Sequence, residues 1–139
     1  MPFKLEFPYK RSLGPVIGGF LAGLREQRLL GARTASGRVL VPPLEYDPES
    51  GESTEAELVE VGPGGVVKGF TWNPDPKETQ PLDRPFAWAL VELDGADTSL
   101  LHALAVDSAD AVSIGMRVKP RWREEPRGHV TDLECFVPE

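Results

Sequence analysis

The sequence contains one cysteine and two histidines among 139 residues, so few side chains are available for disulfides, metal ligation or nucleophilic catalysis. A single cysteine, Cys135, excludes an internal disulfide and is typical of a reducing compartment. Cys135 alternates with Leu133 and Val137, and this spacing predicts one apolar strand face with the thiol in the core. His102 lies inside an apolar run, so we expect a hydrogen-bonded structural histidine. His129 follows a glycine in a predicted turn, and this scattered set predicts no metal site.

The sequence also lacks the common motifs for phosphate binding, nucleophilic catalysis and metal-dependent hydrolysis. It has no glycine-rich phosphate loop, no Gly-x-Ser-x-Gly elbow and no His-Glu-x-x-His pair. We therefore predict no catalytic residues and no enzyme activity for the chain on its own. No apolar run approaches the roughly 20 residues of a membrane span, and the first residues lack the apolar core of a signal peptide. We expect a cytoplasmic protein.

Positive charge is the minority and is unevenly distributed. The chain has 15 Lys and Arg against 22 Asp and Glu, a formal net charge of −7. Residues 1–44 carry seven basic and two acidic side chains, whereas residues 45–110 carry three and fifteen. The acidic middle repels a nucleic-acid backbone, and the basic first third suits an anion such as phosphate. Solvated faces are the competing interpretation of the same pattern.

The first clear structural pattern in the sequence is that of an N-terminal helix. Residues 1–11 contain two prolines and predict an extended arm, and Pro15 fits a first helical position. Apolar residues then recur at helical spacing, and we expect the helix to end at Gly31. The apolar stripe consists of Ile17, Phe20, Leu21 and Leu24. Three glycines inside this helix predict close packing, either on a partner or on the chain's own barrel.

The rest of the chain is dominated by strand signals around one long hairpin, residues 85–106. Its first arm is apolar on both alternating faces, which predicts that both faces are covered. Asp94 and Gly95 begin the turn between the arms. Further strand signals occur at residues 57–61, 66–72, 116–123 and 129–137. Five or six short strands after one helix predict a mainly β protein, an OB-fold with a five-stranded Greek-key barrel.

Residues 33–51 carry a resemblance to a known family. The segment RTASGRVLVPPLEYDPESG resembles the zinc-ribbon and OB-fold proteins that accompany thiolases and other acyl-CoA enzymes, in which Cys-x-x-Cys-Gly-Arg precedes Pro-Pro and a second Cys-x-x-Cys. Gly37-Arg38 and Pro42-Pro43 stand in register with that pattern. The four cysteine places hold Arg33, Ser36, Asp47 and Ser50. Thiolates are what such a ribbon offers zinc, so this copy is expected to be a degenerate, metal-free ribbon.

The resemblance covers nearly the whole chain and continues through RPFAWALVELDG, GMRVKPRW and TDLECFVP. It implies an arm and helix at residues 1–31, a degenerate rubredoxin-like ribbon at 32–54 and an OB-fold barrel at 55–139, together one compact domain. It also implies a non-catalytic accessory subunit that binds and stabilises a thiolase-fold or lipid-transfer-protein-like enzyme. That enzyme would carry the nucleophile for thiolytic or retro-aldol cleavage of an acyl-CoA, including steroid or fatty-acyl side-chain degradation. The expected assembly is a hetero-oligomer without nucleic acid or membrane.

Under this resemblance, eight residues are candidates to contact CoA or the partner. Guanidinium groups suit phosphate oxygens, and aromatic rings suit the adenine, the pantetheine or a partner surface. The candidates are Arg25, Arg28, Arg33, Arg38, Phe70, Trp72, Phe86 and Trp88. A place in the barrel core is the competing interpretation for each aromatic, and we expect it for at least two of the four. CoA or acyl-CoA is the expected ligand, with no covalent cofactor and no zinc.

Two other functions stay open at the level of sequence. A stand-alone acyl-CoA or lipid-binding OB module predicts affinity for CoA without a partner. Single-stranded nucleic-acid binding would use the same four aromatics beside a basic strand face formed by Arg117, Lys119, Arg121 and Arg123. The sequence pI of about 4.9 argues against nucleic acid, because phosphate contacts dominate that affinity.

Overall fold

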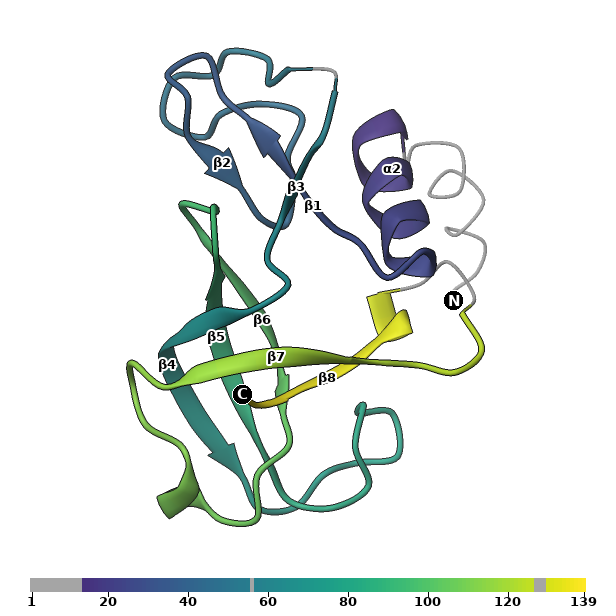
Figure 1. Ribbon diagram of the computed structural model, residues 1–139, viewed down its shortest axis with the longest axis vertical. Helices are drawn as coiled ribbons and strands as arrows, with labels where there is room; N and C mark the ends of the chain where they lie inside the picture. Colours follow the sequence, from purple (N-terminus) through teal and green to yellow (C-terminus); the bar gives the residue numbers. More distant parts are fainter. Residues whose placement is uncertain (1–13, 56, 127–129) are drawn as a thin grey trace, which may run out of the picture.

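The computed structural model describes residues 14–55, 57–126 and 130–139. Within these ranges the chain forms an α-helix, a small three-stranded sheet and a closed five-stranded barrel (Figure 1). The helix and the small sheet lie together at one end of the barrel in this view. We call residues 29–61, which hold the small sheet and its turns, the ribbon lobe. The predicted arm at residues 1–11 and His129 lie outside the described residues.

Helix α2 (Gly14–Arg25) packs through an apolar face, as the sequence predicts. Val16, Phe20 and Leu24 are buried with exposed fractions of 7%, 4% and 1%. Its glycines allow close contact within the chain, because a Cβ on Gly23 would lie 2.7 Å from Leu30 Cδ1. No helix in the described ranges is long and apolar enough to cross a membrane.

The helix ends at Arg25, so the predicted end at Gly31 is wrong. The amides of Gln27 and Arg28 donate to the carbonyls of Leu24 and Gly23 at 3.0 and 2.8 Å, and Gln27 has a φ of 61°. This is the hydrogen-bond pattern of a Schellman cap, which reverses the chain with one left-handed residue. Gly31 instead lies in a strand, where a Cβ would be 2.9 Å from the Leu40 carbonyl oxygen. The glycine therefore serves close strand packing rather than helix termination.

The small sheet of the ribbon lobe has the strand order β2-β1-β3. Its strands are β1 (Leu29–Arg33), β2 (Val39–Leu40) and β3 (Val59–Val61), and both pairings are antiparallel. β1 is the central strand, and its residues Leu29, Leu30 and Ala32 are all buried. Of the four positions at which the resembling family has its cysteines, Arg33 ends β1, and the other three lie in the turns on either side of β2.

Five strands close the barrel, in the order β4-β5-β6-β8-β7. They are β4 (Gly65–Asn73), β5 (Phe86–Leu93), β6 (Ser99–Leu104), β7 (Arg117–Trp122) and β8 (Leu133–Pro138). Short 3-10 helices precede β7 and β8, η1 (Ala109–Ala111) and η2 (Val130–Asp132). The pairings are antiparallel except for the parallel one between β6 and β8. This topology confirms the predicted mainly β OB-fold with an N-terminal helix.

The inner face of the central hairpin, β5 and β6, is covered as predicted, whereas its outer face is covered only in part. Ala87, Ala89 and Val91 point into the barrel and are 0% exposed. On the opposite face Phe86 is 0% exposed because Leu82, Ala103 and Cys135 pack around it. Leu90 on that same face is 42% exposed, so the prediction that both faces are covered is wrong for the middle of the hairpin.

Strand β8 departs from the predicted alternation. A register irregularity between Arg121 and Trp122 of β7 pairs these residues with Cys135 and Leu133 respectively. Leu133 consequently joins the main core, whereas Cys135 belongs to the smaller apolar cluster around Phe86. The predicted single face for Leu133, Cys135 and Val137 is therefore wrong, although the thiol is buried as expected.

The ribbon lobe is fastened to the barrel by the turn between β5 and β6. The amide of Val39 donates to Asp97 Oδ2 at 2.8 Å, and the Asp97 amide donates back to the Val39 carbonyl at 2.8 Å. The amide of Val41 donates to Thr98 Oγ1 at 2.7 Å, and that hydroxyl lies 3.0 Å from the Val41 carbonyl oxygen. We call this set of contacts the hairpin clamp. It satisfies backbone groups of Val39 in β2 and of Val41 just after it.

Candidate functional site

The outer face of β4, β5 and β6 carries an apolar groove that is open to solvent. It has a volume of about 550 Å³ and is lined by Phe70, Thr71, Trp88, Leu90 and Leu101. Leu90 and Leu101 face each other across the β5–β6 ladder and are 42% and 58% exposed. Contiguous exposed apolar surface on a soluble protein marks an interaction site. We call this surface the outer groove and take it as the candidate functional site.

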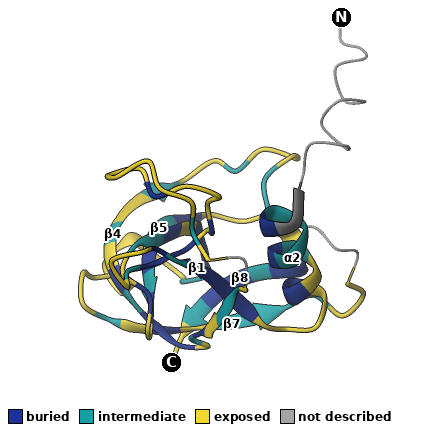
Figure 2. Cartoon of the chain, turned by 90° about the horizontal axis from the view of Figure 1, so that it is seen from above, coloured by how far each residue is buried: buried dark blue, intermediate teal, exposed yellow. Residues whose placement is uncertain are grey.

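The strand registers explain why residues distant in sequence meet in the outer groove. Thr71 of β4 lies opposite Trp88 of β5, and Leu90 of β5 lies opposite Leu101 of β6. Phe70 lies beside Thr71 in the exposed part of β4 (yellow in Figure 2) and is 39% exposed. Because no charged side chain is among the five lining residues, the groove is suited to an apolar partner surface.

The four predicted aromatics divide between the outer groove and the interior. Phe86 is fully buried, and its ring meets that of Trp88 edge to face, with centroids 5.0 Å apart and planes at 72°. Trp72 packs against the main core and is partly buried. Phe70 and Trp88 are therefore the two aromatics that the outer groove presents, with Trp88 held in place by the Phe86 ring. Leu90 and Leu101 were not predicted for the site.

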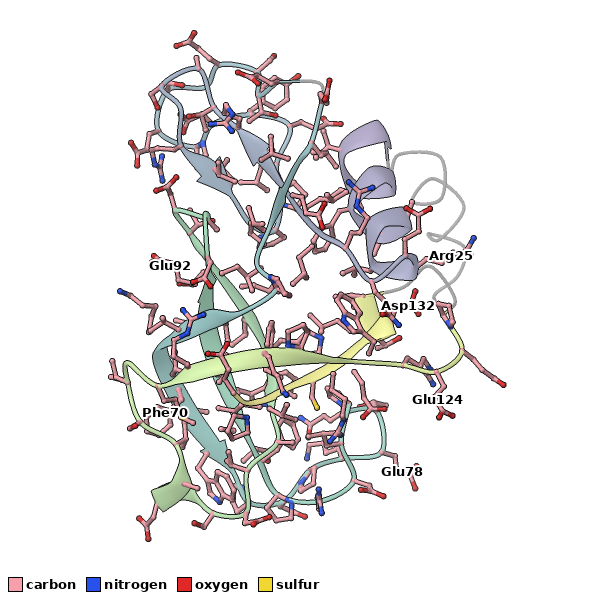
Figure 3. The ribbon with its side chains drawn as sticks, in the orientation of Figure 1. Arg25, Phe70, Glu78, Glu92, Glu124 and Asp132 are labelled. Atoms are coloured by element: carbon pink, nitrogen blue, oxygen red, sulfur yellow. The ribbon has the colours of Figure 1, made fainter. Side chains whose placement is uncertain are left out.

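The four predicted arginines do not form one cluster. Arg28 Nε lies 3.4 Å from Glu60 Oε1, and Arg33 Nε lies 4.0 Å from Glu55 Oε1. Arg38 lies within the ribbon lobe beside two carboxylates. Arg25 is exposed at the end of α2, across the molecule from Phe70 in the view of Figure 3. Contacts of these arginines with CoA stay a prediction.

Two of the four residues of the predicted basic face, Arg117 and Arg121, pair with acidic side chains. Arg117 holds both carboxylate oxygens of Asp94, at 2.8 and 2.7 Å, and also lies 3.4 Å from Glu139. The hydrogen bonds from Arg117 lower the pKa of Asp94, and the same contacts raise the pKa of Arg117. Arg121 lies 2.6 Å from Glu134. These two pairs reduce the uncompensated positive charge that the face could offer to a phosphate backbone.

The residues at the cysteine places of the resembling family do not fit a zinc ion. The guanidinium of Arg33 has no lone pair to offer, and Ser36 Oγ shares a hydrogen bond of 3.0 Å with Thr34 Oγ1. Ser50 Oγ accepts the Glu52 amide at 3.2 Å, and Asp47 Oδ1 accepts the Glu49 amide at 2.9 Å. In the part of the chain that the structure describes, no group of three or more His, Cys, Asp or Glu side chains could hold a metal.

Among the described residues, Cys135 and His102 are both buried in the barrel. Burial raises the pKa of the Cys135 thiol, which makes it a poor nucleophile at neutral pH. His102 is 5% exposed, and burial lowers its pKa. Backbone hydrogen bonds with Val130 and Leu133 act to raise this pKa, but their effect is smaller. The Ala103 amide donates to His102 Nδ1 at 2.7 Å. Both residues thus have structural surroundings, as the sequence predicts.

The closed barrel with this strand order, preceded by a helix and the ribbon lobe, defines an OB-fold protein. The outer groove is an apolar surface of this barrel that is open to solvent. The comparisons with known proteins agree. Residues 58–123 match the family described as ChsH2, C-terminal OB-fold domain. The predicted resemblance to a family of OB-fold proteins is confirmed. A search of curated proteins gives no match.

Two solved structures extend the similarity beyond the barrel. The chain is similar to a structure described as an Ltp2-ChsH2(DUF35) aldolase, with 26% sequence identity and a TM-score of 0.63 over 86% of this chain and 91% of that chain. It also shares its fold with a protein of unknown function from the DUF35 family of Sulfolobus solfataricus. That second likeness has 24% identity and a TM-score of 0.62 over 81% of this chain and 80% of that chain.

Proposed function

We propose that this chain is a non-catalytic accessory subunit that binds and stabilises an aldolase or thiolase-like acyl-CoA enzyme. The observation that carries the proposal is the likeness to a chain of the Ltp2-ChsH2(DUF35) aldolase, which extends over 86% of this chain. A barrel whose buried thiol and histidine are both structural is consistent with a subunit that leaves the chemistry to its partner.

The outer groove supplies the apolar centre that such a subunit interface needs. Stable interfaces bury roughly 800 Å² per partner, with a few apolar or aromatic anchors near the centre and a polar rim. Trp88 is a suitable anchor, because the Phe86 ring already restricts its orientation and little rotamer freedom is lost on binding. Leu90 and Leu101 flank it on adjacent strands, and burial of each would contribute about 1 to 2 kcal/mol.

The finer proposal concerns the substrate. The partner enzyme would cleave an acyl-CoA by thiolysis or retro-aldol chemistry, in steroid or fatty-acyl side-chain degradation, and would supply the nucleophile itself. This chain would contribute interface area and one wall of the CoA channel. Arg25 is the most accessible of the four candidate arginines for a CoA phosphate, since Arg28, Arg33 and Arg38 each pair with a carboxylate.

The test is capture of the partner by the tagged protein from its own host, followed by native mass spectrometry of the complex. Leu90→Lys places a charge in the outer groove and is expected to reduce the retained partner about tenfold or more. Leu44→Lys is the matched control, because Leu44 has the same side chain with an exposed fraction of 44% against 42%, but lies in the ribbon lobe. It should retain the partner at the wild-type level.

The outcomes separate the possible functions. Loss of the partner with Leu44→Lys but not with Leu90→Lys would place the interface on the ribbon lobe and refute the role of the outer groove. A wild-type chain that stays monomeric in lysate and binds acyl-CoA alone would support the stand-alone binding module instead. Affinity for a single-stranded oligonucleotide that falls steeply with salt would indicate nucleic-acid binding.

A further inference from the structure

We infer that the ribbon lobe is held by an ionic cross-link through Arg38, which takes the structural place that the resembling family gives to zinc. This inference concerns the ribbon lobe alone and does not depend on the proposed partner. It rests on the position of Arg38 between two turns, on the burial of its guanidinium nitrogen and on the burial of Asp47.

The two turns that hold Ser36 on one side of β2, and Asp47 and Ser50 on the other, are each closed by their own hydrogen bonds. In the first turn, the Thr34 amide donates to the Arg38 carbonyl at 2.7 Å and the Arg38 amide donates to Thr34 Oγ1 at 3.0 Å. In the second, the Gly51 amide donates to the Asp47 carbonyl at 2.7 Å and the Asp47 amide donates to the Glu52 carbonyl at 2.8 Å. Local bonds therefore shape each turn, but none of these four joins one turn to the other.

Arg38 makes that connection. It ends the first turn, and its Nη1 lies 3.6 Å from Asp47 Oδ1 and 3.0 Å from Glu49 Oε2, both on the second turn. Nη1 is inaccessible to solvent and has no hydrogen bond of good geometry, so its charge is balanced by these two carboxylates through ionic attraction. Asp47 is only 5% exposed and stands at one of the four cysteine places. A carboxylate buried there without Arg38 would be left uncompensated.

The same arrangement disfavours a cation. A divalent ion beside Asp47 would meet the fixed positive charge of Arg38 within the same turn pair, and the hydroxyls of Ser36 and Ser50 are engaged locally. A thiolate site loses its metal to chelators, whereas an arginine cross-link holds no metal that a chelator could remove. The ribbon lobe should therefore be independent of metal supply.

The experiment uses the full-length protein and follows amide hydrogen exchange of residues 45–53. Arg38→Met removes the charge and keeps the aliphatic stem, and we expect the Asp47 and Gly51 amides to exchange about tenfold faster or more. Arg33→Met is the matched control, because Arg33 reaches Glu55 only at 4.0 Å on the exposed surface. Its exchange should change by less than about twofold.

Two further measurements keep the inference testable if Arg38→Met fails to fold. Metal analysis of the purified wild type should find far less than one zinc per chain, and EDTA should leave exchange at residues 45–53 unchanged. Asp47→Asn removes the buried charge, so adding Arg38→Met to it should cost much less protection than in the wild type. One bound zinc per chain, or equal exchange in Arg38→Met and Arg33→Met, would overturn the cross-link.

Discussion

The hairpin clamp allows a quantitative test of how the ribbon lobe is attached. Thr98→Val keeps the volume of the side chain but removes the hydroxyl that bonds both the amide and the carbonyl of Val41. Asp97→Ala removes the carboxylate that accepts the Val39 amide. The changes act on β2 and on the residue after it, from a turn that lies 57 or 58 residues further along the chain.

The magnitude follows from burial. Val41 is 1% exposed, so its amide cannot find water after Thr98→Val, and an unsatisfied buried donor costs about 1–3 kcal/mol. Asp97 itself is exposed, so water can replace part of its contact, and we expect about 1 kcal/mol for Asp97→Ala. The conservative changes Thr98→Ser and Asp97→Asn keep an acceptor at each place and should cost well under about 1 kcal/mol.

The free energy of unfolding is measured by urea titration for all four variants, together with amide exchange at Val39 and Val41. The two disruptive variants should exchange faster at these amides, with the rest of the barrel protected as in the wild type. If Thr98→Val unfolds within about 0.3 kcal/mol of the wild type and of Thr98→Ser, the clamp does not stabilise the ribbon lobe and the reasoning is refuted.

Two further predictions concern buried titratable groups. Burial lowers the pKa of His102 below its ordinary 6.5, so the unfolded chain takes up a proton that the fold resists. The free energy of unfolding should consequently fall as the pH drops below about 6.5, by at most about 1.4 kcal/mol per pH unit. His102→Gln should lose this component in urea titrations across that range, and an unchanged pH slope would contradict it. Burial also raises the pKa of the Cys135 thiol, so a thiol reagent should react about 100-fold more slowly with folded than with unfolded protein. Equal rates would show that the thiol is accessible.

Local patterns were sufficient for much of the fold. The apolar spacing around Phe20 and Leu24 predicts the helix, and the doubly apolar arm of β5 predicts the strand at the centre of the barrel. The helix end was missed because Gln27, a residue without a strong left-handed preference, takes the position that glycine usually fills. Gly31 gave a false signal, since its reason for being glycine is the approach of β2 and not a turn.

The site was harder to predict because it depends on contacts between distant strands. An apolar residue in a strand has the same local pattern whether a neighbouring segment covers it, as with Phe86, or leaves it open, as with Leu90. Asp97 and Thr98 looked like ordinary turn residues, and nothing near them in the sequence identifies β2 as their partner. The pairing of Arg38 with Asp47 follows only once the two turns are placed side by side.

The free edge of strand β4 bears on how the barrel avoids pairing with the strands of other chains. In the described residues its ladder to β7 covers only Gly65 and Val66, so the remainder of β4 has β5 as its one strand neighbour. A β-bulge interrupts this edge, and the extra residue is the exposed Lys68. A bulge and a lysine are what proteins use to prevent edge strands from pairing with other chains. The edge beside the outer groove is thus protected from aggregation, while the groove itself stays open to a partner's side chains.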